Sequence, residues 1–450
     1  MDNEIEMKSS LFPKKHINSS QVAKQANDLN KSITNKVDTP VEGYSCLSSG
    51  AFIPSAISLV SATLGAGTVT LPFLAYENGI VLSSILVIIG ASISYFCGML
   101  LVRCAIIVKA ERYEDFAEYC FGKKAINPTS WCNVLTLLGF VISYIVFVKT
   151  LIPHIFRICF PNTIEEENSA NQWLYELFSA TFYSFCVLLP LGFAREIGTL
   201  RYNSIFGVFC TLYLTAMMIS MFFLDHSLVP HRLENIKQAK LWDISYTGMM
   251  NSIPFVVFAF LYQPNMPMVY RELKKQSYSQ TMLVTIAASI FSVAVYILVS
   301  SFGYLCTIDE GKAVNILLLK INNFSFQIGI FLFFFVICGS APMALVPAKD
   351  TLEHILKGSG ERLSQKENII VTVIMVVLCY LCAVAVPGIT EAITILGCTT
   401  NPLSGFLLPI VFYLKIDKDA PKWKVICCYL IFCFIICVSI QSFYLFITED

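Results

Sequence analysis

The sequence predicts an all-α integral membrane protein with eleven membrane-spanning helices. Composition is the first reason: 56% of the residues are hydrophobic, only 14% are charged and the mean hydropathy is +0.67. Soluble proteins carry about 25% charged residues. The second reason is that the chain contains mostly apolar runs, each near the roughly 20 residues that cross a bilayer. Several runs are separated by only a few polar residues, so no soluble catalytic domain fits between them.

The predicted spans follow one another from residue 52 onward. They are 52–76, 80–108, 131–156, 174–194, 202–224, 246–270, 281–306, 324–347, 368–386, 389–414 and 423–446. The first ten divide into two groups of five, over residues 52–224 and 246–414, and the eleventh is an extra helix. We therefore expect a transmembrane domain over residues 51–450.

Residues 1–50 contain no apolar run and are rich in Ser, Asn, Lys and mixed charge. This composition is typical of a disordered segment. No cleavable signal peptide is apparent, so we expect the first span to direct insertion. The sequence predicts a disordered cytoplasmic tail.

Charge predicts the orientation. If the N-terminus is cytoplasmic, most of the 31 Lys and Arg residues fall in the tail and in cytoplasmic loops, as the positive-inside rule requires. The glycosylation sequon at Asn323 then lies outside the cytosol. Both a plasma membrane and a vacuolar or lysosomal membrane are compatible with this pattern.

Most of the 17 cysteines lie inside predicted spans, where cysteine packs as a small apolar residue. They lack His or acidic neighbours at metal-ligand spacing, so we expect neither a metal site nor a cofactor. Cys159 and Cys306 both fall near the predicted outer face, which leaves a disulfide between them open.

The first span is interrupted. Residues 61–68 read Ser-Ala-Thr-Leu-Gly-Ala-Gly-Thr, where a spanning helix is normally uniformly apolar. Unpaired backbone survives at membrane depth only inside protein or beside a water-filled cavity. The pattern therefore predicts a broken helix.

The sixth span carries a second interruption. Residues 258–267 read Phe-Ala-Phe-Leu-Tyr-Gln-Pro-Asn-Met-Pro, and two prolines three apart prevent a complete helical hydrogen-bond ladder. Interrupted spans at matching positions of two halves indicate the solute site of an inverted-repeat transporter. The alternative is two ordinary kinks.

Such a site suits a free amino acid. Backbone amides freed at residues 65–67 can bind the carboxylate, and carbonyls freed at residues 258–260 can accept from the ammonium. No Asp or Glu lies in either break, which favours neutral substrates. The expected substrate-binding residues are Ser61, Thr63, Leu64, Gly65, Ala66, Gly67, Thr68, Tyr144, Phe258, Ala259, Phe260 and Tyr262.

Five motifs, in order along residues 50–415, resemble the amino acid/auxin permease family. They are Gly65-Ala66-Gly67 with Leu71-Pro72-Phe73, Ser143-Tyr144 with Lys149 and Pro153, Tyr262-Gln263-Pro264 with Val269-Tyr270-Arg271-Glu272-Leu273, Pro342 with Val346-Pro347-Ala348-Lys349, and Gly397-Cys398-Thr399-Thr400 with Leu408-Pro409 and Tyr413-Leu414-Lys415. The resemblance implies an eleven-span carrier of the amino acid–polyamine–organocation superfamily. It implies a LeuT-type 5+5 inverted repeat, with helices 1 and 6 broken, that moves amino acids by alternating access.

Two departures from the family pattern concern the coupling ion. Ser61 stands where similar sodium-coupled members carry Asn, and Gln263 stands in place of the usual His. We therefore favour proton coupling or facilitated transport over sodium coupling. Ser61 and Ser340 are the expected ion-coupling residues.

Other functional classes are less well supported by the sequence. An amino acid sensor that signals through residues 1–50 is the alternative on the same scaffold. An enzyme is not expected, because no nucleophile–base pair or nucleotide loop is evident, and nothing indicates nucleic-acid binding. For Lys149, inside the third span, a structural position and snorkelling to the interface both stay open.

Overall fold

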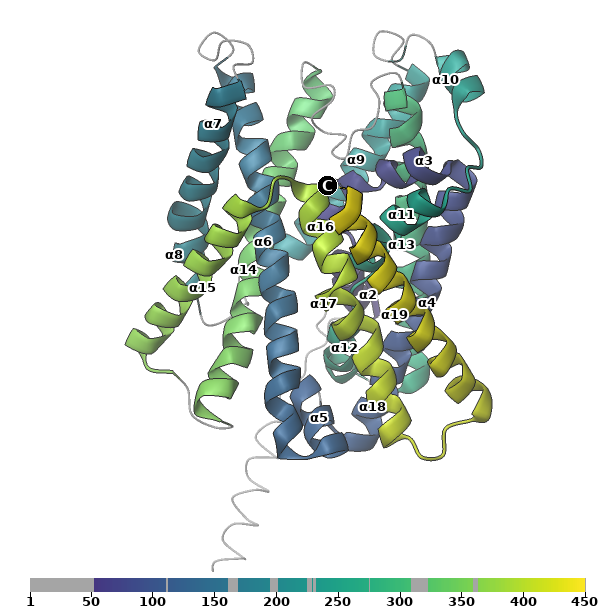
Figure 1. The fold of residues 1–450 in the computed structure, drawn as a ribbon, viewed down its shortest axis with the longest axis vertical. Coiled ribbons are helices and arrows are strands. Elements are labelled where there is room, and N and C mark those ends of the chain that lie inside the picture. Colours follow the sequence, from purple (N-terminus) through teal and green to yellow (C-terminus); the bar gives the residue numbers. More distant parts are fainter. Residues whose placement is uncertain are drawn as a thin grey trace, which may run out of the picture. The chain divides into compact units, whose positions relative to one another are not determined.

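The computed structural model describes residues 52–110, 112–160, 169–194, 201–224, 229, 232–274, 276–308, 323–358 and 363–449, all helices or their connections (Figure 1). They belong to one compact unit, Ser49–Asp450. The predicted N-terminal tail lies outside the described residues.

Long apolar helices account for most of the fold. They are α4 (Ile80–Val108), α6 (Ile126–Cys159), α9 (Arg201–Leu224), α13 (Tyr278–Thr307), α14 (Phe324–Lys357), α15 (Gln365–Ala385) and α19 (Lys422–Glu449). A further span is continuous through α7 (Ser169–Phe182), a π-helical turn (Tyr183–Leu188) and α8 (Leu189–Gly192). Short helices α5 (Tyr113–Phe121) and α10 (Arg232–Gln238) lie between spans.

Within the described residues, 8 helices are long and apolar enough to cross a membrane, or up to 10 if each of two bent pairs is one span. One bent pair joins α2 (Phe52–Thr63) to the segment ending with α3 (Pro72–Asn78), at 50°. The count of eleven therefore stays a prediction. The predicted span that is missing from the count of 10 is residues 246–270. There, α11 (Tyr246–Ala259) and α12 (Met266–Glu272) are each too short to count as a membrane-spanning helix.

A third interruption was not predicted. The helix α16 (Ile389–Cys398) ends before Thr399, and α17 (Thr400–Pro402), a π-helical turn (η9, Leu403–Leu407) and α18 (Leu408–Ile416) continue at a 40° bend. Thr399 has the non-helical angles φ −113° and ψ −89°. Pro402 removes one backbone donor there, which favours the rearranged turn.

The central helices bury two lysines. The Lys149 ammonium on α6 donates to the carbonyl of Ala383, at 3.1 Å, and to that of Val386 at the end of α15. The Lys349 ammonium on α14 donates to two carbonyls, those of Gly192, the last residue of α8, and Ala194, two residues further on. Each distance is 2.9 Å. Cations at helix C-termini satisfy free carbonyls and oppose the helix dipole. Lys149 thus has a structural position.

Neither Cys159 nor Cys306 forms a disulfide in the structure. Cys159 is exposed, whereas Cys306 is buried and its Sγ lies 3.6 Å from the carbonyl oxygen of Met218 on α9. The disulfide that the sequence left open is therefore not formed.

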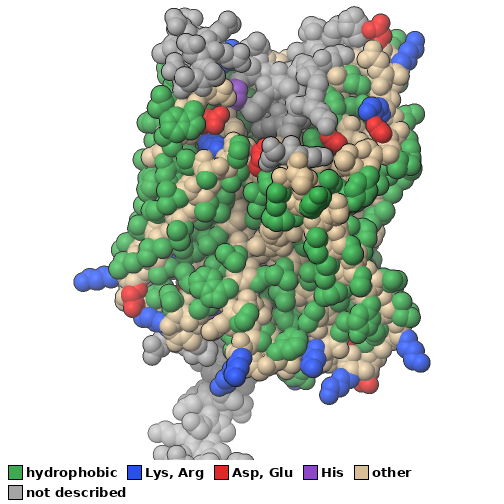
Figure 2. All heavy atoms as spheres, in the orientation of Figure 1, with side chains coloured by type: hydrophobic (Ala, Val, Ile, Leu, Met, Phe, Trp, Pro, Cys, Tyr) green, Lys and Arg blue, Asp and Glu red, His purple; other side chains and the backbone are tan. Residues whose placement is uncertain are grey.

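The outer surface matches a protein embedded in lipid. Hydrophobic side chains cover the middle of the face drawn in Figure 2, and Lys and Arg side chains gather along its lower edge. The α18–α19 connection lies at that edge (Figure 1). Three exposed lysines lie in or beside it: Lys415 near the end of α18, Lys418 in the connection and Lys422 at the start of α19. An apolar belt bordered by basic residues is the pattern of a membrane-spanning protein.

Candidate functional site

The first helix break begins after Thr63. Gly65 adopts extended angles, φ −120° and ψ −151°, before a 3-10 turn (η2, Ala66–Thr70) starts a new helical segment. The Gly65 amide donates to the Thr63 carbonyl at 2.9 Å, and the Thr68 amide donates to the Gly65 carbonyl at 3.1 Å. The first amides of a new segment have no partner one turn earlier, so backbone donors are available at residues 66 and 67.

Gly65 faces Tyr144 on α6. A Cβ atom built on Gly65 would lie 3.9 Å from the Tyr144 hydroxyl, an ordinary contact. The Tyr144 hydroxyl lies near the hydroxyl of Ser340 on α14. The Asn203 amide on α9 donates to the same Ser340 oxygen at 3.2 Å. A line of neutral polar groups thus leads from the break across α6 and α14 to α9.

Gly67 faces the second break. A Cβ atom there would come within 3.2 Å of the Phe258 ring. The Phe258 ring in turn packs against Phe140 of α6, with ring centroids 5.1 Å apart. Glycine at this position lets an aromatic side chain lie directly against the backbone of the first break.

The other predicted residues of the first break are already engaged or enclosed. The Thr63 hydroxyl lies 2.8 Å from both the Val60 carbonyl and the Ser292 hydroxyl. Leu64 and Thr68 are buried, and Thr68 Oγ1 has no hydrogen-bond partner in the described part of the chain. Ser61 is half-buried on α2.

The second break is lined by aromatic residues. The helix α11 ends at Ala259, Phe260 to Tyr262 leave helical geometry, and a 3-10 turn (η6, Gln263–Asn265) precedes α12. Phe260 packs edge-on against Tyr296 of α13, with ring centroids 5.2 Å apart. Tyr262 points elsewhere: its hydroxyl lies 3.1 Å from that of Ser289.

The structure brings some predicted residues together and separates others. Gly65 meets Tyr144, and Gly67 meets Phe258. Tyr262 lies instead between α4 and α13, near Gly98 and Ser289. Of the two ion-coupling residues, Ser340 bonds within the line of polar groups described above, through Asn203 and the Val336 carbonyl, at 3.2 and 2.8 Å.

Sequence reasoning missed the contribution of α13. Tyr296 donates to the carbonyls of Thr63 and Ala259, the last helical residues before each break. Ser292 and Ser300, four residues to either side, contact the first helix through Thr63 Oγ1 and the Leu71 carbonyl. The four-residue spacing of these hydroxyls is the signal that could have identified them.

Gln263 has an unusual environment. Its side chain is completely buried, and neither amide atom has a hydrogen-bond partner among the described residues. A Cβ atom on Gly405, in the π-helical turn of the tenth predicted span, would lie 3.2 Å from Gln263 Oε1. The position that lacks the family's usual His therefore faces the third helix break.

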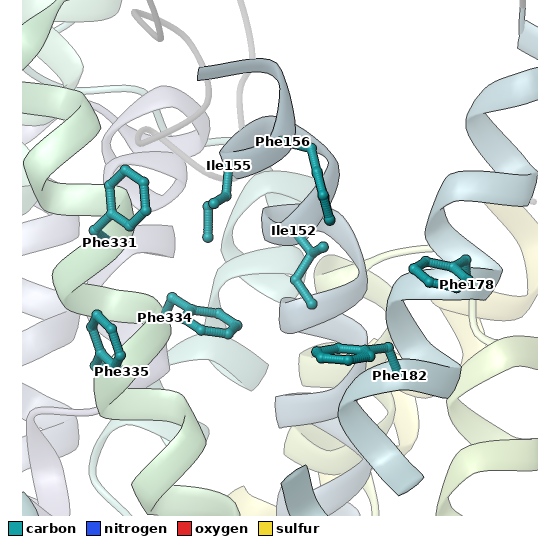
Figure 3. A pocket seen from close by; sticks show the side chains of 8 residues that line it. All are labelled: Ile152, Ile155, Phe156, Phe178, Phe182, Phe331, Phe334 and Phe335. Carbon is teal, nitrogen blue, oxygen red and sulfur yellow. The ribbon is translucent and has the colours of Figure 1, made fainter. Parts of the chain in front are cut away.

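An apolar pocket of about 290 Å³ lies elsewhere, between α6, α7 and α14 (Figure 3). Its lining consists of Ile152, Ile155, Phe156, Phe178, Phe182, Phe331, Phe334 and Phe335. It includes none of the predicted site residues. A lining without polar atoms cannot replace the water around an ammonium or a carboxylate, so we do not assign the amino acid site to it.

Across the described ranges, no group of three or more His, Cys, Asp or Glu side chains could hold a metal ion. The groups around the two breaks are backbone, hydroxyl, amide and aromatic. They can bind a zwitterion by hydrogen bonds and enclose an apolar side chain.

The fold is that of a multi-pass membrane protein of the LeuT type. MhsT, solved in complex with L-phenylalanine, is similar with a TM-score of 0.61 and 12% identity, over 87% of this chain and 98% of that one. A Na⁺-coupled sialic acid symporter is similar with a TM-score of 0.50 and 12% identity, over 82% of this chain and 79% of that one.

The family follows from the sequence comparison. Residues 49–448 match the transmembrane amino acid transporter protein family, and the chain belongs to it. A curated relative from Danio rerio, the sodium-coupled neutral amino acid symporter 2, is 23% identical over 392 residues, which cover 82% of this chain and 76% of the relative. The family resemblance expected from the motifs is confirmed.

Proposed function

We propose that this protein is a secondary transporter that moves neutral amino acids across a membrane by alternating access. The carrying observation is that the two helix breaks meet: Gly67 lies against Phe258, with only 3.2 Å between a Cβ position and the ring. Two interrupted helices that meet inside a bundle form the solute site of many transporters. Family membership and the similarity to MhsT support the same function.

In the proposed binding mode, the carboxylate accepts hydrogen bonds from amides at residues 65–67, and the ammonium donates to carbonyls at residues 258–260. Tyr144 closes the site from α6, since its hydroxyl lies 3.9 Å from a Cβ position on Gly65. Phe258 and its neighbour Phe140 supply an apolar wall. This wall favours substrates with uncharged side chains.

Proton coupling or facilitated transport is the proposed mode, in preference to sodium coupling. Ser61 offers one hydroxyl oxygen. An Asn would offer an amide carbonyl oxygen, which carries a larger partial negative charge and binds sodium more strongly. Ser340 already accepts from Asn203 and donates to the Val336 carbonyl. The sodium coupling stated for the Danio rerio relative makes sodium the alternative to be tested.

The test is uptake of a panel of labelled amino acids into proteoliposomes, with pH and sodium gradients imposed separately. We expect uptake of neutral amino acids that an inward proton gradient stimulates or leaves unchanged, and that replacing sodium by choline does not reduce. Uptake that requires sodium would refute the coupling proposal alone. A folded protein that transports no amino acid would refute the proposed function and leave the sensor as the alternative.

For orientation, we propose a cytoplasmic N-terminus in a plasma membrane or a vacuolar or lysosomal membrane. The exposed basic residues at the α18–α19 connection support this assignment. Asn323 would then lie outside the cytosol, where its side-chain oxygen caps α14 by accepting from the Ser325 amide at 2.9 Å.

A further inference from the structure

One face of α13 contacts both broken helices through hydroxyl groups. Ser292 lies 2.8 Å from Thr63 Oγ1, and Ser300 donates to the Leu71 carbonyl at 3.0 Å. Between them, Tyr296 donates to the carbonyls of Thr63 and Ala259. Residues four apart share one face of a helix, so these three hydroxyls act from one surface. Tyr296 alone contacts both breaks in this set.

The two acceptors of Tyr296 are special because each ends a helix. Thr63 is the last residue of α2, and Ala259 is the last residue of α11. Carbonyls at helix C-termini have no partner within the helix, and they carry the negative end of the helix dipole. Two such ends repel each other when no donor lies between them. A shared hydroxyl proton satisfies both groups and opposes this repulsion.

Burial and ring packing fix the position of the Tyr296 side chain. Tyr296 is completely buried, and its ring packs edge-on against Phe260 with a centroid separation of 5.2 Å. The oxygen of Ala259 lies 3.2 Å from its hydroxyl. A carbonyl oxygen has two lone pairs. The Thr63 carbonyl uses both, since it also accepts from the Gly65 amide at 2.9 Å. The Ala259 carbonyl keeps one after Tyr296 donates, and it can therefore accept from a substrate ammonium.

We propose that Tyr296 is a positioning residue for transport. Its hydroxyl holds the C-terminal ends of α2 and α11 at a fixed spacing, so that the Ala259 carbonyl is positioned to bind the substrate ammonium. This role rests on the amino acid site proposed above. It assigns to α13 a part in assembling that site.

The functional test compares Tyr296→Phe with Tyr304→Phe. Tyr304 lies two turns along the same helix, is also buried and also has a backbone partner, since it accepts from the Lys240 amide at 3.2 Å. Among the described residues, it has no hydrogen bond to the broken segments. Each change removes one oxygen and keeps the ring. We expect Tyr296→Phe to raise the KM for uptake by about tenfold, with Vmax changed less than KM, because one buried hydrogen bond is lost. Tyr304→Phe should move neither parameter.

A second readout needs no substrate. In hydrogen-exchange mass spectrometry of the purified full-length protein, Tyr296→Phe should speed amide exchange at residues 64–68 and 260–262 together, by about tenfold. Tyr304→Phe should leave both segments unchanged. An unchanged KM with wild-type transport, or faster exchange in only one segment, would overturn the proposal. Joint acceleration in a protein that transports nothing would support the link and refute only the transport function.

Discussion

The two helix breaks differ in what lines them. The first break is lined mostly by backbone, because Gly65 and Gly67 have no side chains. A Cβ atom on Gly65 would be at ordinary van der Waals distance from the Tyr144 hydroxyl. The second break is filled by buried aromatic rings, among them Phe258 and Phe260. The difference indicates a division of work. In the proposed binding mode, the first break binds the carboxylate and the carbonyls of the second break bind the ammonium, which all amino acids share. The aromatic rings of the second break distinguish the side chains.

A large side chain at Gly67 should have the largest effect. Gly67→Leu places its Cβ 3.2 Å from the Phe258 ring and pushes further atoms into the space between the breaks. We expect Vmax/KM for every amino acid to fall by roughly 100-fold or more, measured by uptake into proteoliposomes. The double variant Gly67→Leu with Phe258→Ala should recover part of the activity. If the single variant transports normally, the meeting of the two breaks is not the site.

Gly65→Ala should have a smaller effect. Its Cβ meets the Tyr144 hydroxyl at 3.9 Å, so the fold accepts the methyl group while the space for the substrate shrinks. We expect KM to rise by about tenfold for all substrates alike. The control is Gly207→Ala on α9, whose Cβ would lie 3.5 Å from Val336. Equal KM values for the two variants would contradict a binding role for Gly65.

Phe258→Leu should separate the two roles. Removing the ring that packs between Gly67 and Phe140 leaves a smaller side chain in the apolar wall and more space for the substrate. We expect preference to shift about fivefold toward larger neutral amino acids, within the range that pocket methylenes discriminate. Competition assays with alanine and phenylalanine measure the shift. A uniform loss for all substrates would place Phe258 with the first break instead.

Tyr144→Phe should have the smallest effect. It removes the hydroxyl that lies near Ser340 and Gly65, but it keeps the packing of the ring. We expect KM to rise about threefold, as for one neutral hydrogen bond. A pH profile of uptake gives a sharper measurement. A change in its shape would indicate that the line of polar groups from Tyr144 to Asn203 takes part in proton coupling.

The sequence predicts the helices well because a bilayer requires long apolar runs, which few other structures need. The breaks near Gly65 and Pro264 were visible because glycines and prolines interrupt such runs. The break at Thr399 was not, since its signals, Pro402 and Gly405, are also compatible with an ordinary kink. Tertiary structure decides between the two.

The role of α13 could not be read from the sequence for a different reason. Ser292, Tyr296 and Ser300 lie in an apolar helix, where hydroxyls often bond to their own helix or pack against a neighbour. Only the fold shows that Tyr296 reaches the carbonyls of Thr63 and Ala259, which lie 233 and 37 positions earlier in the sequence. Lys149 illustrates the same limit, because its partners at the end of α15 are distant in sequence.

The most direct test of the central claim is substrate counterflow in proteoliposomes loaded with an unlabelled neutral amino acid. We predict that the wild-type protein transiently accumulates external labelled amino acid without any imposed ion gradient, and that Gly67→Leu does not. Absence of accumulation by a folded wild-type protein, across a panel of neutral amino acids, would contradict the account. Equal accumulation by the wild type and Gly67→Leu would also contradict it.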